Sequence, residues 1–190
     1  MHKLFHVLAA VVALPVLLGA QQPTTAPPDN PITASEKGLY MVLVSPVVRA
    51  AEKMPEENYA FKPTPEVRSF GQLVGHVADA NYMFCAMAQG LPTPSTSIEK
   101  TKTSKADLVA ALKDAVASCG KAFDSMTDAS GSELVSFRGF KLAKLTLLSL
   151  NTAHTDEHYG NMVTYLRLKG IVPPTSENAP APAPAKPSGN

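Results

Sequence analysis

Tryptophan is absent from the 190-residue chain, cysteine occurs only twice, and aromatic residues make up 6% of the sequence. An excess of either charge is also missing, because 17 lysines and arginines are balanced by 16 aspartates and glutamates. A nearly neutral chain does not provide the basic surface with which proteins bind nucleic acids or anionic membranes. We therefore expect neither nucleic acid nor a membrane surface as a partner.

Long apolar runs are missing too, except for one near the N-terminus. This run covers residues 7–18, follows Lys3 and is followed by Gly19 and Ala20. The order is typical of a secretory signal peptide, so we expect residues 1–20 to direct export to the periplasm or the extracellular space. The run is shorter than the roughly 20 residues of a transmembrane helix, and we predict no membrane span.

Proline and polar residues set the limits of a single predicted domain. Residues 21–31 predict a flexible N-terminal linker, and residues 173–190, with alternating alanine and proline, predict a disordered tail. Residues 32–172 remain, which is enough for one domain with one core. Its two cysteines, Cys85 and Cys119, form either a disulfide, as suits an exported protein, or two buried free thiols. The sequence leaves both alternatives open.

Apolar residues at helical spacing predict an all-α domain without a convincing strand. Four amphipathic helices joined by loops of short to moderate length are typical of a four-helix bundle. The connection over residues 91–103 contains two prolines and predicts a loop, as do residues 127–132. The four predicted helices cover residues 32–54, 69–90, 104–126 and 142–169.

Polar residues and one proline mark where these helices begin or bend. Thr33 or Ser35 is expected to cap the first helix, and Pro46 predicts a kink or break within it. Ser69 and Gln72 have the spacing of a capping box, which predicts the start of the second helix.

Three histidines remain once the predicted signal peptide is set aside. His154 and His158 are four residues apart and therefore share one face of the last helix, in a stripe that also contains Leu150 and Asn161. His76 recurs in phase with the apolar residues of the second helix. Burying three unpartnered imidazoles would cost roughly 1–3 kcal/mol each, which a shared cation would relieve. The pattern predicts a three-histidine metal site for Zn²⁺ or Ni²⁺, with hydrogen-bonded core histidines as the alternative.

Other residues near the histidines are weaker candidates for the site. Residues 154–158 match the H-x-x-E-H pattern of some zinc peptidases, which need a carboxylate later in the chain as the third zinc ligand. The only acid after His158 is Glu177, in the predicted tail, so we reject that class. Glu157 is expected to lie behind the metal ligands or on the solvated face, with a role as a catalytic base as the alternative. Asp79 is expected either to orient an imidazole or to lie on the surface.

Two polar side chains that flank the histidines are pocket candidates. These are Tyr82 in the second predicted helix and Asn161 in the last. Ordinary packing or capping is the alternative for both. Neither residue type identifies a substrate.

Two segments resemble the DinB-like family, also called DinB/YfiT-like. They are residues 54–81, MPEENYAFKPTPEVRSFGQLVGHVADAN, and residues 154–174, HTDEHYGNMVTYLRLKGIVPP. The resemblance extends over residues 32–174. It implies an up-down-down-up four-helix bundle with a long crossover, and a divalent metal held by His76, His154 and His158. Characterised relatives include thiol-dependent transferases and an isomerase that acts with small thiols.

These observations favour a metal-dependent hydrolase that acts on a small molecule. A predicted signal peptide departs from the family pattern and argues against cytoplasmic thiol cofactors. The alternatives are a thiol-dependent transferase-like enzyme and a non-catalytic protein that binds a metal or another ligand. We leave open whether the chain is catalytic at all and whether it forms a homodimer.

Overall fold

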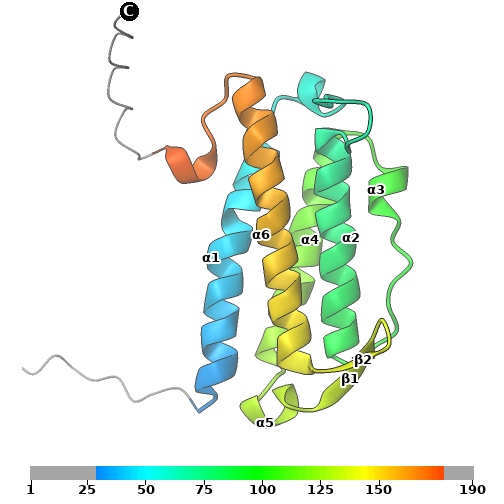
Figure 1. The fold of residues 1–190 in the computed structure, drawn as a ribbon, viewed down its shortest axis with the longest axis vertical. Coiled ribbons are helices and arrows are strands. Elements are labelled where there is room, and N and C mark those ends of the chain that lie inside the picture. Colours follow the sequence, from blue (N-terminus) through cyan, green and yellow to red (C-terminus); the bar gives the residue numbers. More distant parts are fainter. Residues whose placement is uncertain (1–28, 178–190) are drawn as a thin grey trace, which may run out of the picture.

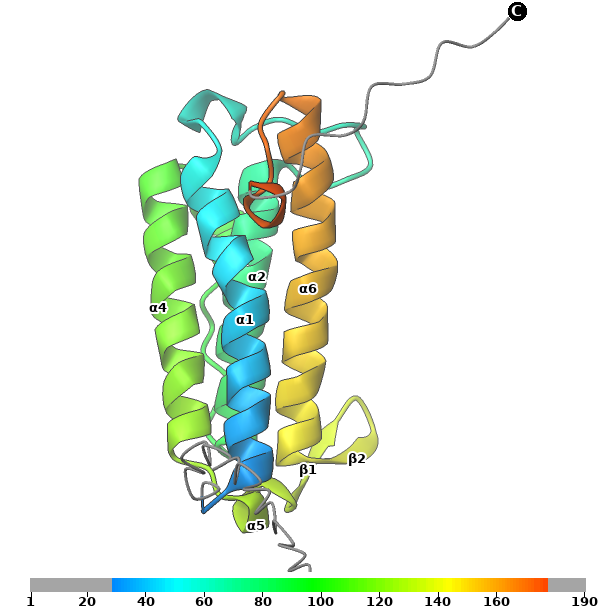
Figure 2. The ribbon, with the colours of Figure 1, turned by 90° about the vertical axis from the view of Figure 1, so that its left-hand side faces the viewer.

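Four long helices form the frame of the protein. The computed structural model describes residues 29–177, in which α1 and α6 run upward and α2 and α4 run downward in Figure 1. This is the up-down-down-up order that the resemblance to the DinB-like family implies. Both α1 and α2 pack against α4 and against α6, so α1 lies diagonally across the bundle from α2 (Figure 2). The bounds are Pro31–Lys53 for α1, Phe70–Ala88 for α2, Lys105–Asp124 for α4 and Lys144–Leu168 for α6.

The start of α2 is fixed by the predicted capping box. The Ser69 hydroxyl accepts a hydrogen bond from the Gln72 backbone N–H at 3.2 Å, and the Gln72 side chain accepts one from the Ser69 N–H at 2.8 Å. Both bonds satisfy amides that would otherwise have no partner at the helix end. Since His76 follows Ser69 by seven residues, this cap also sets where the imidazole leaves the helix.

The first helix differs from its prediction at its N-terminus. Neither Thr33 nor Ser35 caps it, because both lie inside α1. Instead the Asp128 carboxylate accepts hydrogen bonds from the backbone N–H groups of Ile32, at 3.2 Å, and Thr33, at 2.8 Å. A partner 95 residues away in the chain cannot be recognised from local sequence.

Pro46 does not break α1, which continues from Pro31 to Lys53. A proline in a helix loses one backbone hydrogen bond, and packing on two neighbouring helices offsets that loss here. The inward face is that of Tyr40, Val44 and Val47, which are all buried. The apolar residues Leu39 and Val42 are 49% and 67% exposed, so apolar character alone does not identify the buried face of α1.

A β-hairpin precedes α6 where the sequence predicts no strand. Its strands are β1 (Leu134–Phe137) and β2 (Phe140–Ala143), which pair antiparallel with Phe137 opposite Phe140. Arg138 and Gly139 form the two-residue turn with φ of 48° and 85°. Positive φ at both positions suits the twist of a tight hairpin. The prediction of no strand is wrong, because strands of four residues are too short to show an alternating pattern. Since β2 continues to Ala143, α6 begins at Lys144 and not at residue 142.

Four short helical turns occupy segments that were predicted to be loop or tail. They are the 3₁₀ turn η1 (Glu56–Asn58), α3 (Ile98–Thr101), α5 (Asp128–Gly131) and the 3₁₀ turn η2 (Pro174–Ser176). Thr175 in η2 hydrogen-bonds to the Tyr159 hydroxyl, and Glu177 pairs with Lys53 at 2.8 Å. The tail boundary predicted at residue 173 is therefore too early. The predicted signal peptide and the remainder of the tail lie outside the described residues.

The disulfide between Cys85 and Cys119 links α2 to α4 inside the core. Both cysteines are fully buried, and their Cα atoms are 5.1 Å apart. The Asn151 amide lies 3.5 Å from the Cys119 sulfur and donates a 2.9 Å hydrogen bond to Asn81, which also accepts one from the Tyr40 hydroxyl. The contacts of Asn151 and Asn81 therefore join residues of all four long helices. Within residues 29–177, no helix has both the length and the apolar character that a membrane span requires.

Candidate metal centre

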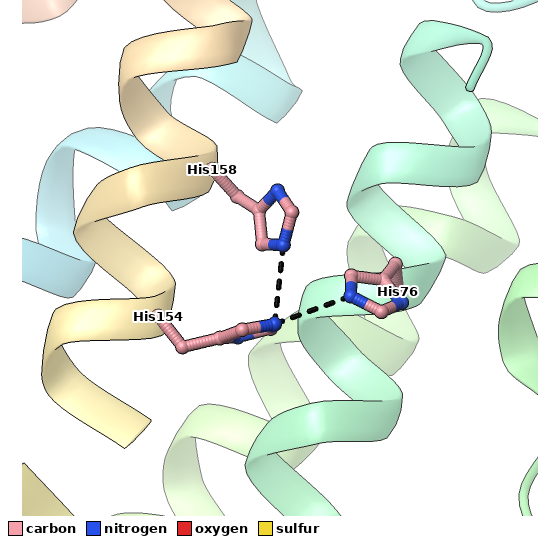
Figure 3. A group of neighbouring side chains, drawn as sticks. All are labelled: His76, His154 and His158. Carbon is pink, nitrogen blue, oxygen red and sulfur yellow. Dashed lines mark hydrogen bonds between the residues drawn. The ribbon is translucent and has the colours of Figure 1, made fainter. Parts of the chain in front are cut away.

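Three imidazoles converge between α2 and α6. Figure 3 shows His76 projecting from α2 toward His154 and His158, which project from successive turns of α6. The Nε2 atom of His154 lies 3.2 Å from Nε2 of His76 and 3.1 Å from Nε2 of His158. One ring nitrogen from each residue lies within 4.8 Å of the other two. Residues 78 positions apart in the chain are thus brought to one point.

Burial keeps the imidazoles of His154 and His158 uncharged. His158 is only 7% exposed, and burial, together with the neighbouring His154, lowers its pKa to about 4. Burial and the nearby His76 likewise lower the pKa of His154. Both side chains are consequently neutral at pH 7, and only a neutral imidazole has a nitrogen lone pair available for a metal.

A carboxylate outside the cluster orients His76. Glu99 accepts from Nδ1 of His76 at 2.9 Å with one oxygen, and from Nε of Arg68 at 2.9 Å with the other. With its proton on Nδ1, His76 presents the lone pair of Nε2 to the other two rings. Carboxylate partners of this kind are usual behind metal-binding histidines.

The other two rings have different surroundings. Asn161 places its amide 3.3 Å from Nδ1 of His158. Nδ1 of His154 is buried and has no hydrogen-bond partner among the described residues. His154 is therefore held by packing and by its contacts through Nε2, and the ring of Phe84 lies 6.0 Å from its own.

Asp79 and Gly75 place Glu99 beside His76. The Asp79 carboxylate accepts hydrogen bonds from the backbone N–H groups of Ile98 and Glu99, each at 2.9 Å, and from the Thr96 hydroxyl. A Cβ atom on Gly75 would lie 2.7 Å from the Cα atom of Glu99, so only glycine permits this close approach. Asp79 does not contact an imidazole and acts one step away, through the segment that carries Glu99.

Glu99 itself was missed in the sequence because it lies in a segment predicted to be loop. A glutamate is common in loops, so its presence there indicates no function. Its contact with His76, 23 residues earlier, cannot be predicted from the periodicity of a helix or a strand. The one available signal was the pair Gly75 and Asp79 on the same helix as His76. Nothing in the sequence shows which segment packs against Gly75.

Two cavities open on either side of the histidines. The first, which we name the loop pocket, has a volume of about 700 Å³, and His158 and Asn161 line it together with Pro63, Glu66, Val67, Arg68, Leu73, Glu99, Thr164 and Tyr165. The second, the hairpin pocket, has a volume of about 470 Å³. Its lining comprises His76, Asp79, Ala80, Met83, Phe84, Phe137, Arg138, Leu150, Ala153, His154 and Glu157.

The predicted site residues thus fall into three groups. His76, His154 and His158 converge, and Asn161 contacts His158 at the loop pocket. Glu157 is exposed and lines the hairpin pocket without joining the cluster of nitrogens. Tyr82 lines neither of these pockets, and burial together with the charge of Asp114 in α4 raises its pKa.

The comparisons with known proteins agree with this architecture. Residues 47–162 match the model of the DinB superfamily. A DinB-like protein from Bacillus cereus superposes with a TM-score of 0.67 at 15% identity, over 74% of this chain and 95% of that one. A DinB-like protein from Bacillus subtilis gives 0.60 at 22% identity, over 73% and 93%. An uncharacterised protein from Escherichia coli gives 0.58 at 15% identity, over 76% and 96%. None of the curated proteins matches the sequence.

Proposed function

This chain belongs to the DinB superfamily, and we propose that it is a metal-dependent hydrolase in which His76, His154 and His158 hold one divalent ion, Zn²⁺ or Ni²⁺. The observation that carries the proposal is the convergence of three imidazole nitrogens from two helices. A small molecule that enters from one of the adjoining cavities would be the substrate.

The spacing of the nitrogens supports a metal of this size. Zinc–nitrogen bonds of about 2.0–2.1 Å in a tetrahedron separate two ligand atoms by about 3.3 Å. The two shortest separations here, 3.2 Å and 3.1 Å, are close to that value. Neutral imidazoles are also the donors that zinc and nickel accept readily. A divalent ion with three protein ligands would lower the pKa of a bound water to about 7, which is the chemistry it would contribute.

The side chains around the cluster have separable roles in this proposal. Arg68 and Glu99 fix the tautomer of His76 and hence the direction of its lone pair. Glu157 is the proton acceptor, since the other carboxylate of the hairpin pocket, Asp79, is already occupied by three hydrogen bonds. A positioned base of this kind contributes about 100-fold or more to a hydrolysis rate.

The main rival is a protein that stores or senses a metal without catalysis. A fourth protein ligand that closes the site would favour that rival. Within the part of the chain that the structure describes, the cluster contains three residues, and the acid on the nearest turn of α6, Glu157, lies outside it. Three ligands between two cavities favour an accessible ion and therefore an enzyme.

Hydrolysis of chromogenic esters, such as 4-nitrophenyl acetate and butyrate, tests the proposal. The full chain is freed of metal with EDTA and reloaded with Zn²⁺ or Ni²⁺. We expect activity only after reloading, no activity in His154→Ala, and a loss of about 100-fold in Glu157→Gln. Asp156→Asn is the matched control, because Asp156 is an exposed neighbour on α6 that lines neither pocket.

Three outcomes would count against this reading. Equal rates for the wild type and His154→Ala would show that the hydrolysis does not use the cluster. Metal binding without turnover of any ester or amide would favour the storage protein. Turnover that starts only when a small thiol is added would favour the transferase.

A further inference from the structure

We propose that the hairpin pocket is the substrate subsite and that it selects small molecules with an apolar body and a negatively charged group, which Arg138 recognises. The inference rests on the proposed function for the position of the reacting bond, but not for the binding itself. It is carried by the lining of the pocket, by the charges at its rim and by the way the hairpin is fixed.

The lining of the pocket is mostly apolar. Two long helices and the hairpin provide these side chains, and His76 and His154 are at the inner side of the same cavity. A volume of about 470 Å³ lies in the range of known small-molecule sites, which are apolar with a few polar groups. An apolar group bound here would therefore lie next to the metal cluster. The apolar residues are Ala80, Met83, Phe84, Phe137, Leu150 and Ala153.

The charges differ between the two pockets. In the loop pocket, Arg68 is paired with Glu99, and Glu66 adds a second carboxylate. In the hairpin pocket, Arg138 forms no ion pair with any described residue. In the loop pocket, an anionic group would thus meet two carboxylates and an arginine that is already paired. In the hairpin pocket, it would meet the unpaired guanidinium of Arg138.

Two carboxylates also line the hairpin pocket, and they do not neutralise Arg138. Asp79 uses its oxygens for Thr96, Ile98 and Glu99. Glu157 lies on α6, beyond ion-pair distance of Arg138, where it remains available as the proton acceptor. The pocket therefore offers one unpaired cation and one unpaired base to a bound molecule.

The hairpin holds Arg138 in place before any ligand binds. The ring of Phe137 packs against that of Phe84 in α2 with 5.3 Å between centroids, which fixes the hairpin on the bundle. The guanidinium of Arg138 lies 5.3 Å over the Phe137 ring. A stacked guanidinium keeps its N–H groups free at the edge of its plane, where they match the two oxygens of a carboxylate. Because the arginine is positioned beforehand, little side-chain entropy is lost on binding.

Calorimetric titration with two matched probes tests the inference. One probe is 4-phenylbutyrate, and the other is 4-phenylbutan-1-ol, which has the same apolar body without the charge. We expect the full chain to bind the anion about tenfold more tightly than the alcohol, and Arg138→Gln to remove that preference. Lys141→Gln is the control, since Lys141 is a cation of the same hairpin that does not line the pocket. Phe137→Ala should weaken both probes, and the anion more than the alcohol, because the ring that positions the Arg138 guanidinium is lost.

Each titration is repeated after treatment with EDTA, which separates this inference from the proposed function. A preference for the anion that survives EDTA and disappears in Arg138→Gln supports the subsite even if the cluster binds no metal. A preference that disappears with EDTA but persists in Arg138→Gln would assign recognition of the anion to a metal and overturn the inference. Equal affinities for both probes in the wild type would overturn it as well.

Discussion

Replacing Cys85 and Cys119 together with alanine is expected to lower the free energy of unfolding by about 3–4 kcal/mol. The disulfide spans 34 residues and links α2 to α4, so it removes much of the freedom of the unfolded chain. Most single domains are stable by only about 5–15 kcal/mol, and this loss would be a large part of the total. Urea unfolding of the variant and the wild type, followed by circular dichroism, measures the difference.

Reduction of the wild-type protein provides the control for this prediction. Wild type in excess dithiothreitol should unfold at a urea concentration close to that of the double variant, while dithiothreitol should leave the variant unchanged. EDTA is present in every sample so that metal binding does not contribute to either stability. Unfolding free energies within about 1 kcal/mol of each other in the oxidised wild type and the variant would contradict the expected role of the bond.

Glu99→Gln is expected to weaken zinc binding about 10- to 100-fold. The substitution keeps the shape of the side chain but removes the negative charge that holds Nδ1 of His76 and Nε of Arg68. His76 then loses the charged partner that fixes its tautomer and strengthens its Nε2 as a donor to the metal. Competition with a zinc-sensitive dye measures the dissociation constant. Glu66→Gln is the matched control, because Glu66 lines the loop pocket and has no hydrogen bond to a histidine.

Gly75→Ala tests the same contact through the backbone. A Cβ atom at this position would lie 2.7 Å from the Cα atom of Glu99, so α3 must move away from α2. We expect zinc affinity to fall as it does in Glu99→Gln while the helical circular dichroism signal is retained. If both variants bind zinc as tightly as Glu66→Gln does, then Glu99 has no part in holding the metal.

The helical frame and the three histidines were within reach of the sequence. Helical periodicity, the capping box at Ser69 and the four-residue spacing of His154 and His158 are local patterns, and local hydrogen bonding fixes them. The prediction that His76 meets His154 and His158 rested on the family resemblance as much as on the spacing of the histidines. An inward position on a helix does not state how far along the bundle the side chain will lie.

The parts that were missed depend on contacts between distant residues. Glu99 reaches His76 only because Asp79 caps its segment and Gly75 leaves room for it. The N-terminus of α1 is capped by Asp128, which follows Thr33 by 95 residues in the chain. The strands of the hairpin have only four residues each, which is too short for a periodic pattern to predict them. The hairpin is held by the packing of Phe137 on Phe84, which is a contact between distant residues.

The metal content of the purified full chain is the most direct test of the central claim. Inductively coupled plasma mass spectrometry on the wild type and His154→Ala, after incubation with zinc or nickel and removal of free ions, gives the number of ions per chain. We expect close to one ion per chain in the wild type and almost none in the variant. Equal, near-zero metal in both proteins would contradict it.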